Sequence, residues 1–463
     1  MSENASMPFS PARLARNPMN ISAPIRSHAR HLFNFLDQSP SPWHVVAGME
    51  KLLAEHNFQA LDETRTWSIQ PGGAYWVMRG GSSLIAFRVG SGWLGEQGFR
   101  IVGAHTDSPG FRLKPSAEHE AEKMSCMGVE IYGSPILASF TDRDLSLAGR
   151  VCFRHDDGIK TSLLHFHRSL VRLPNLALHM NRSVNEDGLK LDKQTQTPLL
   201  LASMLAEEAD SGRFLRTVAE RCGCTAEDLL SWEFNVFDNQ KAAIWGLDGE
   251  YFASGRIDNL ASCHAGLTAL LETNAGRHVS VAAFFDHEEV GSESYKGAMG
   301  SFLSDVLERI VSGLGVETPI YRQALARSFL VSADAAHAHH PNHARMYEPQ
   351  HPVRVNLGPA IKINCNQRYA TDAVTEARFA RICELAGIPY QKYVHRTDLA
   401  CGSTIGPMTA ARLGVATVDV GCPMWAMHSA RESAGVLDQF WFCQALKTFF
   451  SLEELPSVTS AKK

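Results

Sequence analysis

The sequence predicts an α/β fold in which helices flank a mixed β-sheet, with a β-rich segment inserted into the chain. Apolar residues at helical spacing alternate with short apolar runs of strand length in the first and last parts of the sequence. The middle part consists mainly of strand-like runs between polar loops. We therefore expect one α/β domain formed by residues 23–104 and 250–455, and an inserted β-rich domain at 105–249. Residues 1–22 and 456–463 are predicted tails.

Composition is that of an ordinary globular protein and excludes some partners. Of the 463 residues, 44% are hydrophobic and 20% are charged, and a net charge of −5 gives no support for a nucleic-acid partner. No apolar run approaches the roughly 18 residues of a membrane span, so no membrane partner is expected. The ten cysteines are scattered, which is typical of reduced thiols in a cytoplasmic protein. Residues 1–22 contain one acid and two arginines, so a transit peptide is the alternative to a mobile tail.

The first part of the α/β domain is predicted to form two helices and three strands. Apolar residues recur at helical spacing from Ile25 to Leu36, which predicts a helix over about 23–37. A second helix is expected through 49–56, after a segment rich in Ser and Pro. Three β-rich runs follow, AYWVMRG, SLIAFRVG and FRIVGAH, and glycine-containing turns separate them.

The inserted segment is predicted to be mostly β-structure. Its strand-like runs are GVEIYGSPIL, DLSLAGRVCFRH and LVRLPNLALHM. One helix is expected within it, over PLLLASMLAEEA at 198–209. Such an insertion serves as an assembly surface or covers an active site, and composition does not decide between these two roles.

The last part of the chain returns to alternating helices and strands. A helix is expected to begin near Asp258, and the apolar run VSVAAFF at 279–285 reads as a strand buried on both faces of the sheet. Further strands are expected in SFLVSA, IKIN and ATVDVG. The segment TEARFARICELAG and residues 435–454 are predicted helices.

Ionisable residues follow several of these apolar runs directly. In open α/β sheets, ligands bind beyond the carboxyl ends of the strands. Adjacent carboxylates in such a place need a partner, because burial of an unpaired charge is costly. Four clusters end apolar runs and a fifth opens a helix: His105 with Asp107, Glu288 with Glu289, Asp334, His428, and Asp258.

These residue types suit a site for two divalent ions. Imidazole and carboxylate ligands can complete each ion while one carboxylate bridges them. In the adjacent glutamate pair, one side chain is expected to bind metal while the other acts as a general base. Asp107 can support His105 from nearby. The simpler alternatives are an exposed acidic turn at 286–289 that begins a helix, and a helix-capping role for Asp258.

The motifs that contain these residues resemble one known family. GAHTDSPG, the Asp258-Asn259 pair, DHEEVGSES, DAAHAHHPN, IKINCNQRYATD and MHSARE resemble the aspartyl aminopeptidase family of dizinc metallo-aminopeptidases. The resemblance spans residues 25–455 and the motifs occur in the family's order. It implies a metallopeptidase catalytic domain with an inserted dimerisation-type domain.

The resemblance also implies roles for single residues. Two Zn²⁺ per subunit, with Mn²⁺ or Co²⁺ as substitutes, are implied, and Asp258 bridges them. His105 and Asp334 are assigned to one ion and Glu289 and His428 to the other, although the division of these outer ligands stays open. Glu288 is implied as the general base, and Asp107 as a residue that orients a ligand or modulates the acidity of the metal.

Three further matches concern the substrate. His179, in LVRLPNLALHMNR, matches a histidine that reaches an active site across a subunit interface and stabilises the oxyanion; the alternatives are a metal ligand or a plain strand-end histidine. His340 matches a histidine near the substrate pocket. Lys362 matches a lysine that faces an acidic first side chain of the substrate, and its alternative is a solvated strand face.

The implied activity is hydrolysis of the N-terminal residue of peptides that have a free N-terminus, with preference for Asp or Glu. The resemblance also implies a homo-oligomer, a dodecamer built from dimers, which encloses its active sites. One alternative is a member of the same family that prefers neutral N-terminal residues. The other is a catalytically silent particle used for assembly or cargo binding.

Overall fold

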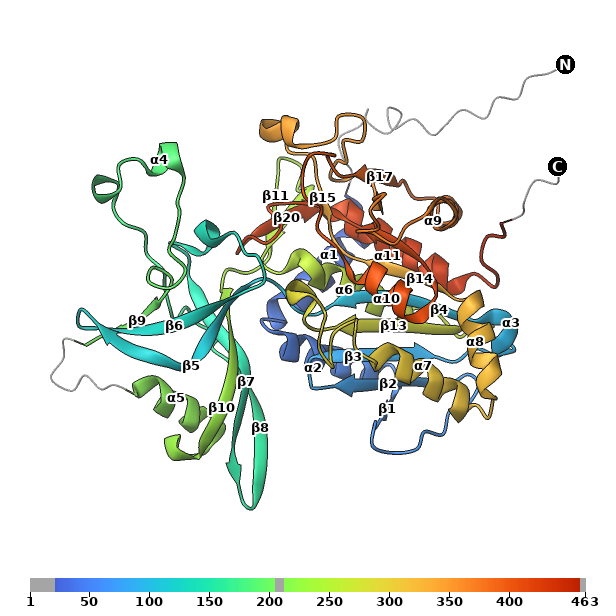
Figure 1. Ribbon diagram of the computed structural model, residues 1–463, viewed down its shortest axis with the longest axis horizontal. Helices are drawn as coiled ribbons and strands as arrows, with labels where there is room; N and C mark the ends of the chain where they lie inside the picture. The colour runs from blue at the N-terminus through green and yellow to red at the C-terminus, as the bar shows by residue number, and fades with distance from the viewer. Residues whose placement is uncertain (1–20, 205–211, 459–463) are drawn as a thin grey trace.

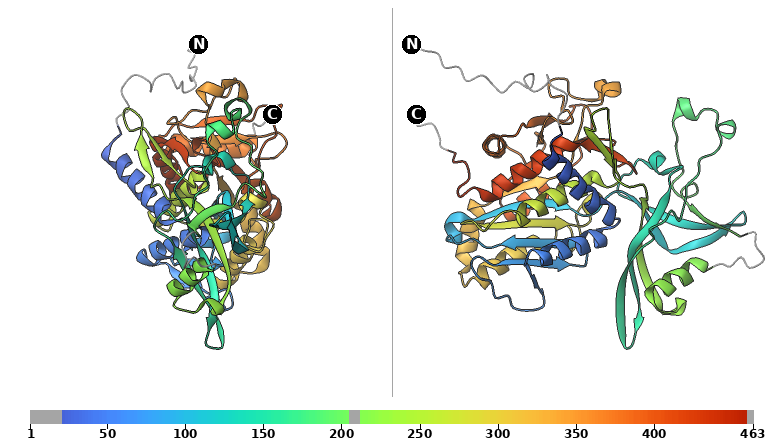
Figure 2. Two further views of the ribbon diagram at one scale, coloured as in Figure 1. Left: turned by 90° about the vertical axis from the view of Figure 1, so that its left-hand side faces the viewer. Right: turned by 180° about the vertical axis from the view of Figure 1, so that it is seen from behind.

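The computed structural model describes residues 21–204 and 212–458 (Figures 1 and 2). The predicted tails at 1–22 and 456–463 lie for the most part outside the described residues, as does the second half of the helix expected at 198–209. Within the described part, no helix is long and apolar enough to cross a membrane.

A nine-stranded mixed sheet forms the centre of the larger part of the molecule. Four neighbouring strands, β13, β4, β14 and β18, run parallel, whereas β3 pairs antiparallel with both β2 and β13, and β16 pairs antiparallel with β18. The α/β class predicted from the sequence is therefore confirmed. In sheet order the strands are β1 (Gln59–Leu61), β2 (Ala74–Arg79), β3 (Ser83–Arg88), β13 (Val279–Phe285), β4 (Phe99–His105), β14 (Phe329–Ala333), β18 (Ala416–Gly421), β16 (Ala360–Ile363) and β17 (Gln391–Val394).

Helices cover both faces of this sheet, which explains why its central strands are mostly apolar. In β4, Val102 and Ala104 belong to the core on one face, while Phe99 and Ile101 belong to the core on the other. The first face is covered by α1 (Ala23–Gln38), α2 (Pro42–Glu55), α6 (Ile257–Leu271), α9 (Ala373–Leu385) and α11 (Val436–Ser451). The second face is covered by α3 (Leu94–Gln97), α7 (Phe302–Gly313), α8 (Thr318–Arg327) and α10 (Ile405–Leu413).

A six-stranded antiparallel sheet lies beside the central sheet and is built from the middle of the chain (Figure 1). Helix α5 (Arg213–Cys222) packs Phe214 and Val218 into a separate core with Phe234. The division into domains at 104 and 250 stays a prediction. The sheet order is β8 (Gly158–His165), β7 (Leu145–His155), β10 (Leu229–Asp238), β5 (Gly110–Ala121), β6 (Met124–Tyr132) and β9 (Leu199–Ser203). This segment also contains α4 (Val184–Asp187), η2 (Leu137–Phe140), η3 (Leu178–Met180) and η4 (Ala226–Asp228).

Two expectations for this segment were wrong. Residues Leu199–Ser203, expected to be helical, form edge strand β9 because they pair with β6. The run LVRLPNLALHM does not form a strand; it contributes only isolated bridges through Val171 and Arg172 and then the short η3. In the first case pairing with β6, which is distant in the sequence, overrides the local helical pattern.

A third sheet of five strands brings the later motifs together. It joins residues near 250, 335, 423 and 433, so the segments that carry Asp258, Asp334 and His428 meet at one place. The order is β11 (Ala243–Trp245), β12 (Tyr251–Ser254), β20 (Glu432–Gly435), β19 (Pro423–Trp425) and β15 (Ala336–His337). The remaining short elements are η5 (Glu288–Val290) and η6 (Pro341–Met346).

Candidate metal centre

Three parallel strands end side by side and place the first ligands. Strands β13 and β14 flank β4, and Phe285 at the end of β13 pairs with His105 at the end of β4. The chain then continues into η5, which carries Glu288 and Glu289, while Asp334 directly follows β14. Because parallel strands share one carboxyl edge, these side chains converge there.

The buried Glu432 connects the other two candidate ligands, Asp258 and His428. Oε2 of Glu432 accepts a hydrogen bond from the Asp258 backbone N–H at 3.1 Å, and Oε1 accepts one from the His428 N–H at 2.7 Å. Burial, followed by the charge of Asp258, raises the pKa of Glu432 to about 8. The sequence analysis assigned no role to Glu432, although it is the last residue of the motif MHSARE and the first residue of β20.

The ligands form two groups that share Asp258. Nε2 of His105 lies 3.4 Å from Asp258 Oδ1 and 3.9 Å from Asp334 Oδ1. Nε2 of His428 lies 3.5 Å from Asp258 Oδ2 and 3.5 Å from Glu289 Oε2. The two oxygens of Asp258 thus face different groups, which is the arrangement that a bridging carboxylate requires.

These groups fit divalent ions such as zinc. Bonds of about 2.0–2.1 Å in a tetrahedral site put neighbouring ligand atoms about 3.3 Å apart, close to most of the distances found here. Asp258 Oδ1 and Glu289 Oε1 are buried, and within the described residues neither has a hydrogen-bond partner. Buried carboxylate oxygens without a donor are costly, and a bound cation removes that cost.

Glu288 lies next to the two groups that contain Asp258 but belongs to neither of them. Its Oε2 lies 4.0 Å from His105 Nε2, and it also forms a third group with His105 and Glu289. In the metal-free protein, burial raises the pKa of Glu288 to about 8; the carboxylates of Asp334 and Asp107 add to this effect, and His105 opposes it. The side chains of Glu288 and Glu289 are only 13% and 5% exposed, so the alternative of an exposed acidic turn is wrong.

Asp107 holds His105 close to the turn that carries Glu288 and Glu289, the glutamate turn. Its Oδ1 and Oδ2 each accept a backbone N–H bond at 3.1 Å, from Glu288 and Glu289 respectively. Oδ1 also lies 3.3 Å from His105 Nδ1, and Tyr132 donates its hydroxyl to Oδ2 at 2.7 Å. Sequence reasoning missed Tyr132, because it comes from β6 of the inserted segment and no local pattern links it to Asp107.

The carboxylates control the charge of the histidines. Burial alone lowers the pKa of His428, but Asp258 and Glu289 outweigh it and raise the pKa to about 10. His105 behaves in the same way: burial opposes protonation, yet Asp107, Asp258 and Asp334 hold its pKa well above the usual value. In the absence of a metal, protons therefore occupy part of the cluster.

The substrate candidates are placed at different distances from this cluster. Lys362 is 2% exposed, donates to the Ala335 carbonyl at 3.1 Å and lies 3.6 Å from Asp334 Oδ2, so the solvated-face alternative is wrong. His340 begins η6 and accepts a hydrogen bond from the Asn342 N–H, and no contact found among the described residues joins it to the ligands.

His179 is exposed in η3 of the inserted segment. Helix α4, which follows η3 in the chain, lies at the far end of that segment from the central sheet (Figure 1). Among the described residues, His179 belongs to none of the groups that could hold a metal ion.

The chain is similar to known proteins over most of its length. Residues 35–450 match the family model described as Aminopeptidase I zinc metalloprotease (M18). The chain is 44% identical over 427 residues to "Probable M18 family aminopeptidase 2" of Pseudomonas aeruginosa (strain LESB58), covering 92% of this chain and 98% of the relative. It also resembles a chain of the Ape4 and Nbr1 complex, with a TM-score of 0.89, 37% identity and coverage of 94% and 87%. The S. cerevisiae mApe1 dodecamer has a TM-score of 0.79, 27% identity and coverage of 91% and 96%.

An α/β sheet with buried histidines and carboxylates at its carboxyl edge defines a metalloenzyme, and the relatives define its reaction class as removal of N-terminal residues. The chain belongs to the M18 family of zinc metallo-aminopeptidases. The family named from its motifs in the sequence is thereby confirmed.

Proposed function

We propose that the chain hydrolyses the first peptide bond of its substrates with Glu288 as general base and two ions at the Asp258 groups. The observation that carries this proposal is the position of Asp258 between His105 and His428, with Glu288 next to both groups but outside them. His105 and Asp334 would hold one ion, Glu289 and His428 would hold the other, and Asp258 belongs to both groups.

Zinc, when bound, polarises the scissile carbonyl and makes the attacking water more acidic. Glu288 accepts the proton of that water and transfers it to the departing amine as the bond breaks. Asp107 positions Glu288 and Glu289 through their backbone amides and holds the His105 ring. The ligand set, with its histidines and hard oxygen donors, also accommodates Mn²⁺ or Co²⁺.

We further propose a preference for N-terminal Asp or Glu. The support is Lys362, a buried cation next to the ligand Asp334 whose ammonium has one direct hydrogen bond, to Ala335, and so retains donors for a substrate carboxylate. Cleavage rates of Asp-, Glu- and Leu-anilides test this preference. The account expects Asp and Glu to exceed Leu in kcat/KM, and a clear Leu preference contradicts it in favour of the neutral alternative.

The oligomeric proposal is a dodecamer built from dimers. The support is the overall similarity to the S. cerevisiae mApe1 dodecamer, together with an exposed His179 placed away from its own cluster. In this proposal His179 serves the active site of a neighbouring subunit. Sedimentation of the full chain tests the assembly, and a stable monomer with full activity contradicts it.

We place the protein in a reducing compartment, as in the cytoplasm. All ten cysteines are free thiols, and several are buried in apolar surroundings. Titration of the native and the denatured protein with a thiol reagent tests this, because disulfides formed in the cell would lower the count after denaturation.

A further inference from the structure

A buried ion pair lies immediately behind the glutamate turn, and the mechanism above does not use it. We propose that Lys296, acting through Asp286, is a positioning residue that aims Glu288 and Glu289 at the metal centre. The inference rests on the proposed function, because positioning by Lys296 matters only if Glu288 is the general base and Glu289 a metal ligand.

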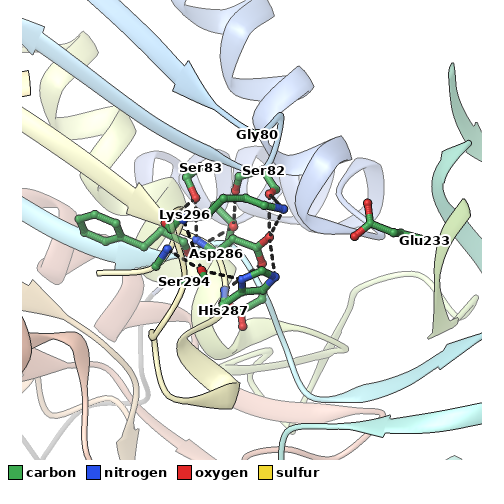
Figure 3. Close-up of polar contacts among 12 residues, drawn as sticks. Gly80, Ser82, Ser83, Glu233, Asp286, His287, Ser294 and Lys296 are labelled. Carbon is green, nitrogen blue, oxygen red and sulfur yellow. Dashed lines mark hydrogen bonds and ion pairs between the residues drawn. The ribbon is translucent and has the colours of Figure 1, made fainter. Parts of the chain in front are cut away.

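Three buried side chains form a closed polar contact (Figure 3). Lys296 Nζ lies 3.3 Å from Asp286 Oδ2 and 3.0 Å from Ser82 Oγ, and Ser82 donates its hydroxyl to the same Oδ2 at 2.6 Å. The exposed fractions are 4% for Lys296 and 0% for both Asp286 and Ser82. The ammonium and the carboxylate therefore neutralise each other away from water.

The second oxygen of Asp286 acts on the chain that leads into the turn. Oδ1 accepts the backbone N–H of His287 at 2.9 Å, and His287 has a left-handed φ of +69°. Nδ1 of the His287 ring lies 2.8 Å from Ser294 Oγ, and the backbone carbonyl of His287 accepts a hydrogen bond from the Ser292 N–H. A residue that is not glycine adopts this backbone region only when its surroundings hold it there. Glu288 and Glu289 are the next two residues.

The pair is anchored to parts of the protein that do not bind metal. Ser82 lies in the turn between β2 and β3, and its carbonyl accepts the hydroxyl of Thr106 at 2.7 Å. Two residues earlier, the Gly80 carbonyl accepts a bond from Arg150 of the inserted sheet at 2.9 Å, and Arg150 pairs with Glu233. The glutamate turn is thus fixed from one side by Asp107 and from the other by the Asp286–Lys296 pair.

Stability alone does not explain such a pair. Removing two charges from water is costly, and apolar residues of similar size often replace a buried ion pair with no loss of stability. An apolar pair cannot supply the acceptor oxygen of Asp286 for the hydrogen bond that the His287 N–H donates. Lys296 keeps Asp286 in place as the acceptor of this hydrogen bond, and the bond in turn orients Glu288 and Glu289.

The test compares Lys296→Met with a matched control, Lys447→Met. Lys447 pairs with Glu272 between α11 and α6 and takes no part in the metal centre. For Lys296→Met we expect kcat to fall about 10- to 100-fold and the apparent zinc affinity to fall about 10-fold, as for other groups that orient metal ligands, while KM changes less than about threefold. For Lys447→Met we expect no change in these three quantities.

Two more variants separate positioning from folding. In Lys296→Met combined with Asp286→Leu, no unpaired charge remains and no side-chain oxygen is left to accept the His287 N–H, so we expect the melting temperature to recover while kcat stays low. Ser82→Ala keeps both charges and removes only the bridging hydroxyl; it carries the test if Lys296→Met fails to fold, and we expect a kcat loss of about 10-fold.

Recovery of kcat together with stability in the double variant overturns the inference, because the pair is then only structural. Wild-type kcat and zinc affinity in folded Lys296→Met, or wild-type kcat in Ser82→Ala, also overturn it. Glu288→Gln distinguishes these failures from failure of the proposed function. Full activity in that variant would show that Glu288 is not the general base, irrespective of the results for Lys296→Met.

Discussion

At the scale of single residues, one buried carboxylate orients both members of the glutamate pair. Asp107 accepts the backbone amides of Glu288 and Glu289 on separate oxygens, and it also meets the His105 ring. Base and ligand therefore share a support that contacts neither of their carboxylates. A substitution of Asp107 therefore alters the orientation of both Glu288 and Glu289.

Replacement of Asp107 by Asn should weaken zinc binding and catalysis together. The amide side chain retains only one acceptor oxygen, so one of the two turn amides loses its partner. We expect kcat and zinc affinity each to fall by about 10- to 100-fold. Steady-state rates and zinc titrations measure this, with Tyr132→Phe as the milder control because it removes only one donor. Unchanged zinc affinity in Asp107→Asn would contradict the assignment.

The charge state of the metal-free cluster leads to a pH prediction. Asp258 and Glu289 hold the pKa of His428 at about 10, so the ring is protonated at pH 7, whereas zinc binds the neutral imidazole. Zinc binding must therefore release protons at pH 7, and the affinity must rise as the pH increases toward 10. Calorimetric titrations of zinc in buffers with different ionisation enthalpies measure the release. Binding without proton release at pH 7 would show that the histidines are already neutral.

The clustering of the candidate ligands could be predicted from the sequence because each follows an apolar strand or opens a helix, and parallel strands share an edge. Glu432 and Tyr132 could not be predicted in this way. Their partners, Asp258 and Asp107, are far away in the chain, and the contacts depend on how three sheets meet. The placement of His340 and Lys362 relative to the ligands likewise required the packed structure.

At the scale of elements, strand β18 sets the position of the ligand that follows β14. The backbone N–H of Asp334 donates to Val420 at 3.0 Å, and Gly421 comes so close that an added Cβ would lie 1.6 Å from the Asp334 carbonyl oxygen. Only a residue without a Cβ fits there, because backbone atoms on both sides cannot move aside cheaply.

Gly421→Ala should therefore displace Asp334 and damage the site along with the fold. We expect a loss of stability of about 1–3 kcal/mol, in the range for overpacking in a core, and a clear drop in zinc affinity. Gly48→Ala in α2 is the control for an added methyl group, since nothing lies within 4 Å of the position its Cβ would take and its φ is not left-handed. Chemical denaturation and zinc titration give the two readings. Full zinc affinity in Gly421→Ala would show that β18 does not position the ligand.

Helices and central strands of the α/β domain followed from periodicity because both faces of the sheet are covered. Edge elements were harder to predict. β9 looks helical in isolation, since its leucines suit either structure, and only pairing with β6 selects the strand. The short η5 turn that carries the glutamates is fixed by Asp107 and Asp286 and not by its own sequence.

At the scale of the whole molecule, the inserted segment is connected to the catalytic machinery in two directions. Tyr132 and Arg150 contact the α/β part of the same chain, whereas His179 lies exposed and away from its own cluster. The first two contacts explain how an insertion supports its own site. The exposure of His179 is the observation that supports the proposal of a second subunit at each active site.

Mixed oligomers test this subunit dependence. His179→Ala and Glu288→Gln chains are each expected to be nearly inactive alone, because each lacks one component of every site. After dissociation and joint reassembly, sites with an intact Glu288 and a neighbour's intact His179 reappear, and random pairing in dimers restores about a quarter of wild-type activity. No recovery in mixed oligomers of normal size would mean that His179 does not act across the interface.

The central claim is that Glu288 is the base and Glu289 a ligand, and zinc content measured together with kcat tests it most directly. For Glu288→Gln, the account predicts two bound zinc ions, as in the wild type, and a loss of kcat of about 100-fold or more. For Glu289→Gln, it predicts loss of zinc from the His428 group. If Glu288→Gln loses zinc while Glu289→Gln retains it, the roles of the two glutamates are reversed and the account is contradicted.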